Sequence, residues 1–95
     1  MEEHQTEGRE AVEATWTAVR LHQEITECIL SDKRVVKCTD VTLLEAGNKF
    51  NLTLTCQFGK DKPLAEVHQI ISELEATLYK RFKALRRITV HAEPA

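Results

Sequence analysis

The side chains best suited to bind a metal ion lie near the C-terminus, where His91 and Glu93 stand two residues apart. Side chains alternate between the two faces of a β-strand, so this spacing points an imidazole and a carboxylate to the same side. Both groups are common ligands of zinc and related divalent ions. If Ile71 is the centre of a helical apolar stripe, His68 lies about 60° from it, at the edge of the core. From the residues alone, a metal site and a solvated strand face both remain open.

The three cysteines are an odd number, widely spaced, and include no CxxC pair. This spacing gives no disulfide framework and favours a reducing, cytosolic setting. Cys56 alternates with apolar residues and is predicted to be a small core side chain, as is Cys28 on a helical apolar stripe. Cys38 begins a predicted strand, and the face to which its thiol points is left open.

Composition and missing motifs point to binding rather than catalysis. The 95 residues, enough for one domain, contain no Gly-rich phosphate loop, GxSxG or HExxH motif, and no Cys–His spacing typical of a nucleophile. No run of about 18 apolar residues predicts a membrane helix. A net charge of −2 does not favour nucleic acid. The basic run at 80–87 is predicted to be a solvated helix end, with a nucleic-acid or lipid patch as the alternative.

Periodicity predicts the elements that would position these side chains. Residues 1–8 read as a polar tail, and residues 9–31 as helix, either continuous or bent near Arg20. The β-branched segment 35–44 and the alternating segment 50–58 predict a hairpin that turns at 46–48.

The second half of the chain predicts a helix and a last strand. Asp61 is expected to cap a helix with Pro63 in its first turn, and the apolar stripe of that helix continues to Leu85. A short strand follows at 87–92. The order helix, strand, strand, helix, strand is typical of a two-layer α+β domain, in which helices cover one face of a three-stranded sheet and the other face stays open to a partner.

With these elements in place, residues 21–94 resemble the cytoplasmic C-terminal domain of the cation diffusion facilitator (cation efflux) transporters. The sharpest parts are the sequence PLAEVH at 63–68 and the YKRF helix end at 79–82. The terminal segment VHAEP at 90–94 is similar to the His-x-Glu/Asp-Pro signature of that family, and residues 38–47 fit its first strand and turn.

The resemblance implies a metallochaperone-like (ferredoxin-like) fold in residues 21–95, with residues 1–20 as a polar tail and helix extension. It further implies a cytoplasmic homodimer that binds zinc or another divalent transition metal near the dimer interface and regulates a membrane-embedded transporter. The ligands carried over are His68, His91 and Glu93. A fourth position is left to water, to Cys38 or to the partner chain.

Two departures from the family keep alternatives open. Members with more ligands place histidines where this chain has Thr39 and Thr55, and a neutral threonine is a poor zinc ligand, so a structural dimerisation module with a decayed metal site is the second hypothesis. The adjacent Cys38 and Cys56 would face the other way unless a β-bulge intervened. In a transporter, residues 1–20 would follow the last membrane helix, yet here they begin with Met1, so the chain is either an excised transporter domain or a free-standing relative. Met1, with no tag-like residues after it, favours the free-standing relative. A small KH-like RNA-binding domain shares the element order, but the chain has no GxxG loop.

Overall fold

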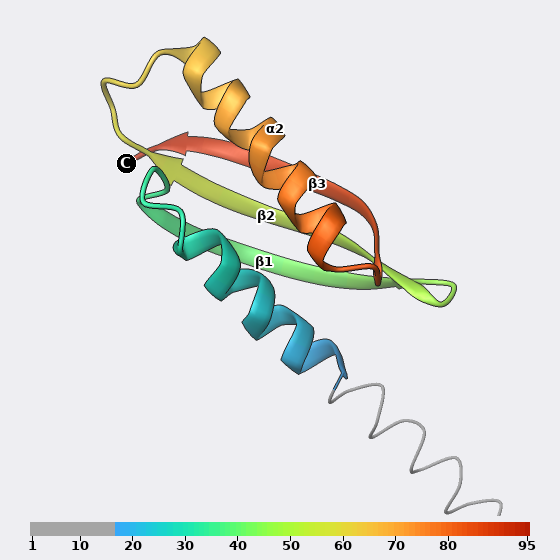
Figure 1. Ribbon diagram of the computed structural model, residues 1–95. Coiled ribbons are helices and arrows are strands. Elements are labelled where there is room, and N and C mark those ends of the chain that lie inside the picture. Colours follow the sequence, from blue (N-terminus) through green and yellow to red (C-terminus); the bar gives the residue numbers. More distant parts are fainter. Residues whose placement is uncertain (1–16) are drawn as a thin grey trace, which may run out of the picture.

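The computed structural model describes residues 17–95 (Figure 1). The expectations for the polar tail, for Trp16 and for the first part of the N-terminal helix lie outside these residues. The predicted order is confirmed: the elements are a helix at 17–30, β1 (Lys37–Ala46), β2 (Lys49–Phe58), α2 (Leu64–Arg81) and β3 (Leu85–Pro94). The helix at 17–30 runs through Arg20 without interruption, and no helix within the described residues is long and apolar enough to cross a membrane.

The three strands form one sheet in the order β1-β2-β3. β1 and β2 are antiparallel, as a hairpin requires, whereas β3 is parallel to β2, a pairing that the sequence left open. The parallel pairing follows from α2, because this helix carries the chain back along the sheet before β3 begins. Both helices lie on the same face of the sheet (Figure 1).

The core fills the space between this face and the two helices. Each contributing element supplies one apolar row, as alternation in β2 and helical periodicity in the helices predict. The buried members are Leu21, Ile25 and Ile29 from the N-terminal helix, Leu52, Leu54, Cys56 and Phe58 from β2, Val67, Ile70, Leu74 and Leu78 from α2, and Val35, Phe82, Leu85 and Ile88.

A bulge in β1 sets which of its side chains face the helices. The turn between β1 and β2, where Gly47 has a φ of 66°, pairs Ala46 with Lys49 and fixes the hairpin register. The three steps along β1 from Thr39 to Thr42 then match only two steps along β2, from Thr55 to Thr53, and Asp40 within this segment adopts a positive φ of 52°. The extra residue reverses the alternation of faces on the N-terminal side of the bulge.

The predicted borders of α2 and of the strands need correction. Pro63 occupies the N-cap position and no side chain caps the helix, so the expected cap at Asp61 is wrong. The helix ends at Arg81, and Leu85, expected on the helical stripe, instead begins β3 opposite Phe50. β1 begins at Lys37 rather than at residue 35.

Candidate metal and dimerisation surface

His91 and Glu93 lie on the sheet face that the helices leave open. In the register, His91 is the partner of Thr55 and Glu93 the partner of Gln57, and both belong to the row that alternates with the helix-facing Ile88. Both side chains are exposed. Because β3 pairs directly with the central strand, these two groups stand on a rigid part of the sheet.

His68 lies in the other layer of the molecule, on α2. The buried residues of this helix are Val67, Ile70, Leu74 and Leu78. With about 100° per residue, His68 lies about 115° from their mean direction and not 60° from the stripe centre, because Ile70 rather than Ile71 is the fully buried residue. His68 is therefore exposed on the outside of the helix layer rather than at the core's edge.

The start of α2 and the end of β3 nevertheless lie at the same end of the molecule. A shallow pocket of about 190 Å³ is lined by residues from both elements, among them Leu64, Val67 and Glu93. Within residues 17–95 of one chain, however, no group of three or more His, Cys, Asp or Glu side chains is placed to hold a metal ion.

Cys38 and Cys56 form a pair of thiols beneath the helices. They are directly opposite one another on β1 and β2, both free, with Cys56 completely buried and Cys38 half-buried against the same core. The hydrogen bond from the Cys56 thiol lowers the pKa of Cys38, and the same bond, with burial, raises the pKa of Cys56. Cys38 thus faces the helices, on the side of the sheet away from His91 and Glu93.

Sequence reasoning did not find this thiol pair. The turn at Gly47 alone would place Cys38 opposite Gln57 and on the open face, and only the bulge at Asp40 shifts it by one residue. The one signal available was the aspartate itself, since Asp tolerates a left-handed backbone better than most residues do.

The bulge also builds a row of side chains across the open face. Thr39 pairs with Thr55, and Thr55 pairs with His91. Thr55 is the one buried polar residue found in the described part of the chain. A hydroxyl row therefore stands beside His91, at the positions where imidazoles would strengthen a metal site.

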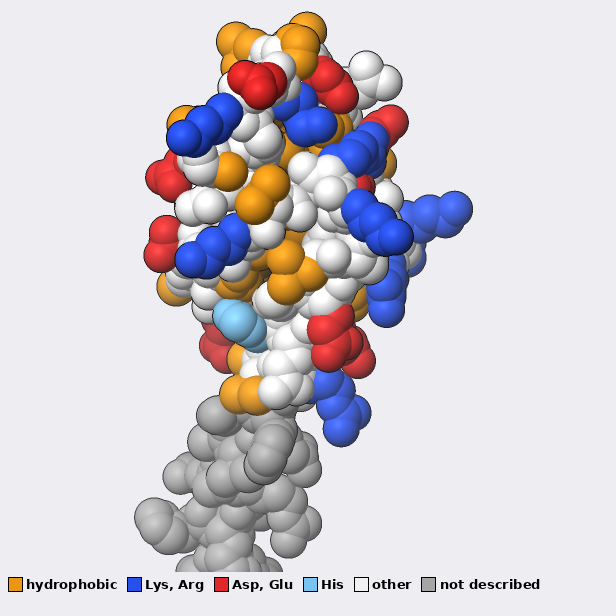
Figure 2. Space-filling view, turned by 90° about the vertical axis from the view of Figure 1, so that its left-hand side faces the viewer, with side chains coloured by type: hydrophobic (Ala, Val, Ile, Leu, Met, Phe, Trp, Pro, Cys, Tyr) orange, Lys and Arg blue, Asp and Glu red, His pale blue; other side chains and the backbone are white. Residues whose placement is uncertain are grey.

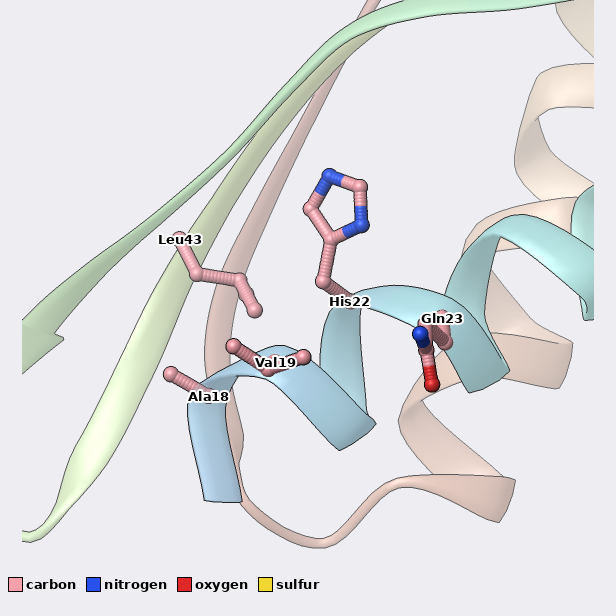
Figure 3. Close-up of a pocket in the computed structure, with 5 residues that line it drawn as sticks. All are labelled: Ala18, Val19, His22, Gln23 and Leu43. Atoms are coloured by element: carbon pink, nitrogen blue, oxygen red, sulfur yellow. The ribbon is translucent and has the colours of Figure 1, made fainter. Parts of the chain in front are cut away.

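A second pocket, of about 350 Å³, lies between the N-terminal helix and β1 and is lined by Ala18, Val19, His22, Gln23 and Leu43. Figure 3 shows the side chains of Val19 and Leu43 pointing toward one another across it, with the His22 ring beside them and Gln23 turned away. Figure 2, which views the left-hand side of Figure 1, shows acidic and basic side chains interspersed, with hydrophobic side chains between them. This face therefore has no single-sign field that would attract a polyanion.

Comparison with known proteins agrees with this architecture. The sequence matches the family described as cation efflux protein, cytoplasmic domain, over residues 20–95. Among solved structures, the metal-bound C-terminal domain of the CzcD transporter from Thermotoga maritima is 17% identical with a TM-score of 0.78, covering 82% of this chain and 91% of that one. At this identity the likeness shows the fold alone.

CzrB, a protein described as a zinc transporter, is more similar in sequence. One of its structures is 28% identical with a TM-score of 0.69 and covers 83% of this chain and 93% of that one. Its Zn form is 29% identical with a TM-score of 0.66, covering 79% and 81%. No curated protein matches the sequence significantly.

The family match extends from the N-terminal helix to the last residue, so it includes the helix-covered sheet, the open face and the His91/Glu93 pair. The family is described as the cytoplasmic domain of cation efflux proteins. This chain belongs to the family of cation efflux protein cytoplasmic domains.

Proposed function

We propose that this chain is a cytoplasmic homodimerising domain that binds a divalent cation of the zinc kind and controls, or mimics, the cytosolic part of a cation efflux transporter. The family assignment supports the setting, and the zinc form of CzrB and the metal-bound CzcD domain support the class of ligand. The observation that carries the proposal is the His91/Glu93 pair on the open sheet face.

The proposed ligands are His91, Glu93 and His68. The first two share one face of β3, and His68 is exposed near the start of α2, the helix end that shares a pocket with Glu93. Since no group of three ligands forms within the described residues of one chain, we place the site where the His91/Glu93 pairs of two copies face one another, with His68 reaching it from the end of α2 that shares a pocket with Glu93. Cys38 is left out of this set, since its thiol faces the core.

The second copy is proposed to contact the open face of the sheet. Two features of this face support an occupant. Leu44 is 62% exposed, and the side-chain oxygen Oδ1 of its neighbour Asn51 is buried without a hydrogen-bond partner among the described residues. A second surface on this face would remove Leu44 from water and supply polar groups with which a reoriented Asn51 amide can pair.

Calorimetric titration with zinc tests the ligand set. We expect the full chain to bind zinc and His91→Ala to bind it at least tenfold more weakly, about 1.4 kcal/mol, because one of three protein ligands is lost. His22→Ala is the matched control, since His22 is exposed on the N-terminal helix and outside the proposed set. Equal isotherms for the wild type and His91→Ala would refute the metal proposal and leave the dimer untouched.

A second candidate function is a structural dimerisation module that has lost its metal site. The hydroxyl row at Thr39 and Thr55 favours it, because these positions share a row with His91 and offer no good zinc ligand. Sedimentation velocity in chelator and in zinc separates the two functions. A metal-responsive domain dimerises more tightly in zinc, whereas a structural module gives the same dimer in both solutions.

A further inference from the structure

The dithiol at Cys38 and Cys56 has no part in the proposed metal site. Residues directly opposite on antiparallel strands have Cβ atoms about 4.5–5.5 Å apart, and a disulfide joins Cβ atoms about 3.5–4.5 Å apart. The two residues are direct partners in the register, and each thiol shifts the pKa of the other. The two ranges meet at about 4.5 Å, so a small approach of the two strands together with rotation of the side chains is enough to bring the sulfur atoms to bonding distance.

Access to solvent differs between the two thiols. Cys56 is 0% exposed at the centre of the core, whereas Cys38 is half-buried on the edge strand β1. A small oxidant reaches the sulfur of Cys38 first, and the only partner within reach of that sulfur across the strand pair is Cys56. Cys28, on the N-terminal helix, is free and half-buried, but no pairing brings it opposite either of them.

We propose that Cys38 and Cys56 are a peroxide-sensitive dithiol that closes to a cross-strand disulfide and locks β1 to β2. The Cys38 sulfur attacks one oxygen of hydrogen peroxide, giving a sulfenic acid and one water. The Cys56 sulfur then attacks the sulfenic sulfur, the new S–S bond forms, and hydroxide leaves and takes up the Cys56 proton as a second water. The two thiols lose two electrons and the peroxide gains them, so the balance closes, and a dithiol reductant reverses the reaction.

The bond would act on the open face as well. Thr39 and Thr55 directly follow Cys38 and directly precede Cys56, and Thr55 is the neighbour of His91. A disulfide between Cys38 and Cys56 therefore fixes the distance between β1 and β2 next to the row Thr39–Thr55–His91. The inference itself rests on the thiol geometry and not on metal binding, so it can fail or hold independently of the proposed function.

Tryptic mass spectrometry tests the disulfide directly. Cleavage after Arg20, Lys33, Lys37, Lys49 and Lys60 puts each cysteine in its own peptide, at 21–33, 38–49 and 50–60. The folded full chain is treated with hydrogen peroxide, then denatured and alkylated without reductant. We expect peptides 38–49 and 50–60 to be joined, with the loss of two hydrogen atoms, and peptide 21–33 to be alkylated.

Three variants make the result interpretable. Cys28→Ser should form the same joined pair. Cys56→Ser, with Cys56→Ala in case serine is not tolerated in the core, should leave Cys38 as a sulfenic acid that dimedone traps. Cys38→Ser should leave Cys56 reduced in the folded chain, because its sulfur is inaccessible. A crosslink that involves Cys28, or Cys38 oxidised beyond the sulfenic acid while Cys56 stays free in the wild type, overturns the proposal.

Discussion

Asp40 adopts a left-handed backbone conformation in the middle of a strand, with a φ of 52°. The bulge at Asp40 adds one residue to β1, and this extra residue decides that Thr39 rather than Cys38 faces the open side of the sheet. For a non-glycine residue this conformation costs roughly 1–2 kcal/mol, less for Asp than for a β-branched residue. A surface residue without a ligand of its own thus sets the chemistry of both sheet faces.

Substitution at residue 40 should reveal that cost. We expect Asp40→Gly to raise the free energy of unfolding by up to about 1 kcal/mol, because glycine adopts positive φ without a Cβ clash. Asp40→Val should lower it by about 1–2 kcal/mol. Urea denaturation measures both, with Glu45→Gly as the matched control. That exposed position of the same strand has no positive φ, so glycine there should lower stability by about 0.5–1 kcal/mol. Stabilisation at both positions would contradict the strain argument.

Tyr79 ties the outer side of α2 to the last strand. The backbone amide of Ile88 donates a hydrogen bond to the Tyr79 hydroxyl at 3.0 Å. Tyr79→Phe removes the acceptor and keeps the ring, so the free energy of unfolding should fall by about 0.5–1.5 kcal/mol.

Hydrogen exchange locates this effect. In Tyr79→Phe the Ile88 amide should exchange faster, whereas the Phe50 amide, bonded to the Ala84 carbonyl at 2.8 Å, should keep its relative protection. Unchanged exchange at Ile88 would mean that water replaces the hydroxyl without loss.

The N-terminal helix joins the core through a single row of buried residues. Ile25 is 0% exposed at the centre of that row, between Leu21 and Ile29. We expect Ile25→Ala to lower the free energy of unfolding by about 2–5 kcal/mol, the range for a buried large-to-small change. Leu30→Ala is the control on the same helix, because Leu30 is 48% exposed and should change stability by less than about 0.5 kcal/mol. Similar values for the two variants in urea would show that the helix does not dock as described.

A polar contact joins the turn after the N-terminal helix to α2. Arg34 makes ion pairs of 2.6 Å with Asp32 and with Glu73. The Arg34 hydrogen bond holds the pKa of Asp32 below its usual value. Since these groups are largely exposed, the contact orders the turn more than it stabilises the fold.

The elements differ in how much of them the sequence determines. The hairpin was predictable because strict alternation in β2 and a glycine turn act locally. The end of α2 was not, because the run from Phe82 to Leu85 contains no glycine or proline and continues the helical period. Tertiary pairing decides there: Leu85 gains a partner in Phe50 by starting β3. Strand alternation put His91 and Glu93 on one face. Helical periodicity could not decide whether Ile70 or Ile71 is the fully buried residue of the stripe, so the predicted position of His68 was wrong.

On the scale of the whole molecule, one sheet face is covered by two helices and the other is bare. The rows across the bare face are Leu44–Asn51–Arg87, Thr42–Thr53–Thr89, Thr39–Thr55–His91 and Lys37–Gln57–Glu93. This order could be expected in outline, because three strands and two helices of this length cover only one face. The particular rows depend on the bulge and on the parallel pairing of β3, which no local pattern specifies.

The middle of the bare face gives the sharpest test of the proposed dimer. Thr53, half-buried at the centre of β2 between Thr42 and Thr89, would lie inside an interface formed by two such faces. Thr53→Arg places a bulky charge there without an oppositely charged partner. We therefore expect the dimer dissociation constant to rise at least tenfold, which corresponds to a loss of about 1.4 kcal/mol of binding free energy. Thr77→Arg, the same change at an exposed position of α2, should leave it unchanged. Sedimentation equilibrium measures both constants, and far-ultraviolet circular dichroism verifies that each variant is folded. If only Thr77→Arg weakened the dimer, the second copy would contact the helix layer instead, and the ligands that it contributes to the metal site would lie there too.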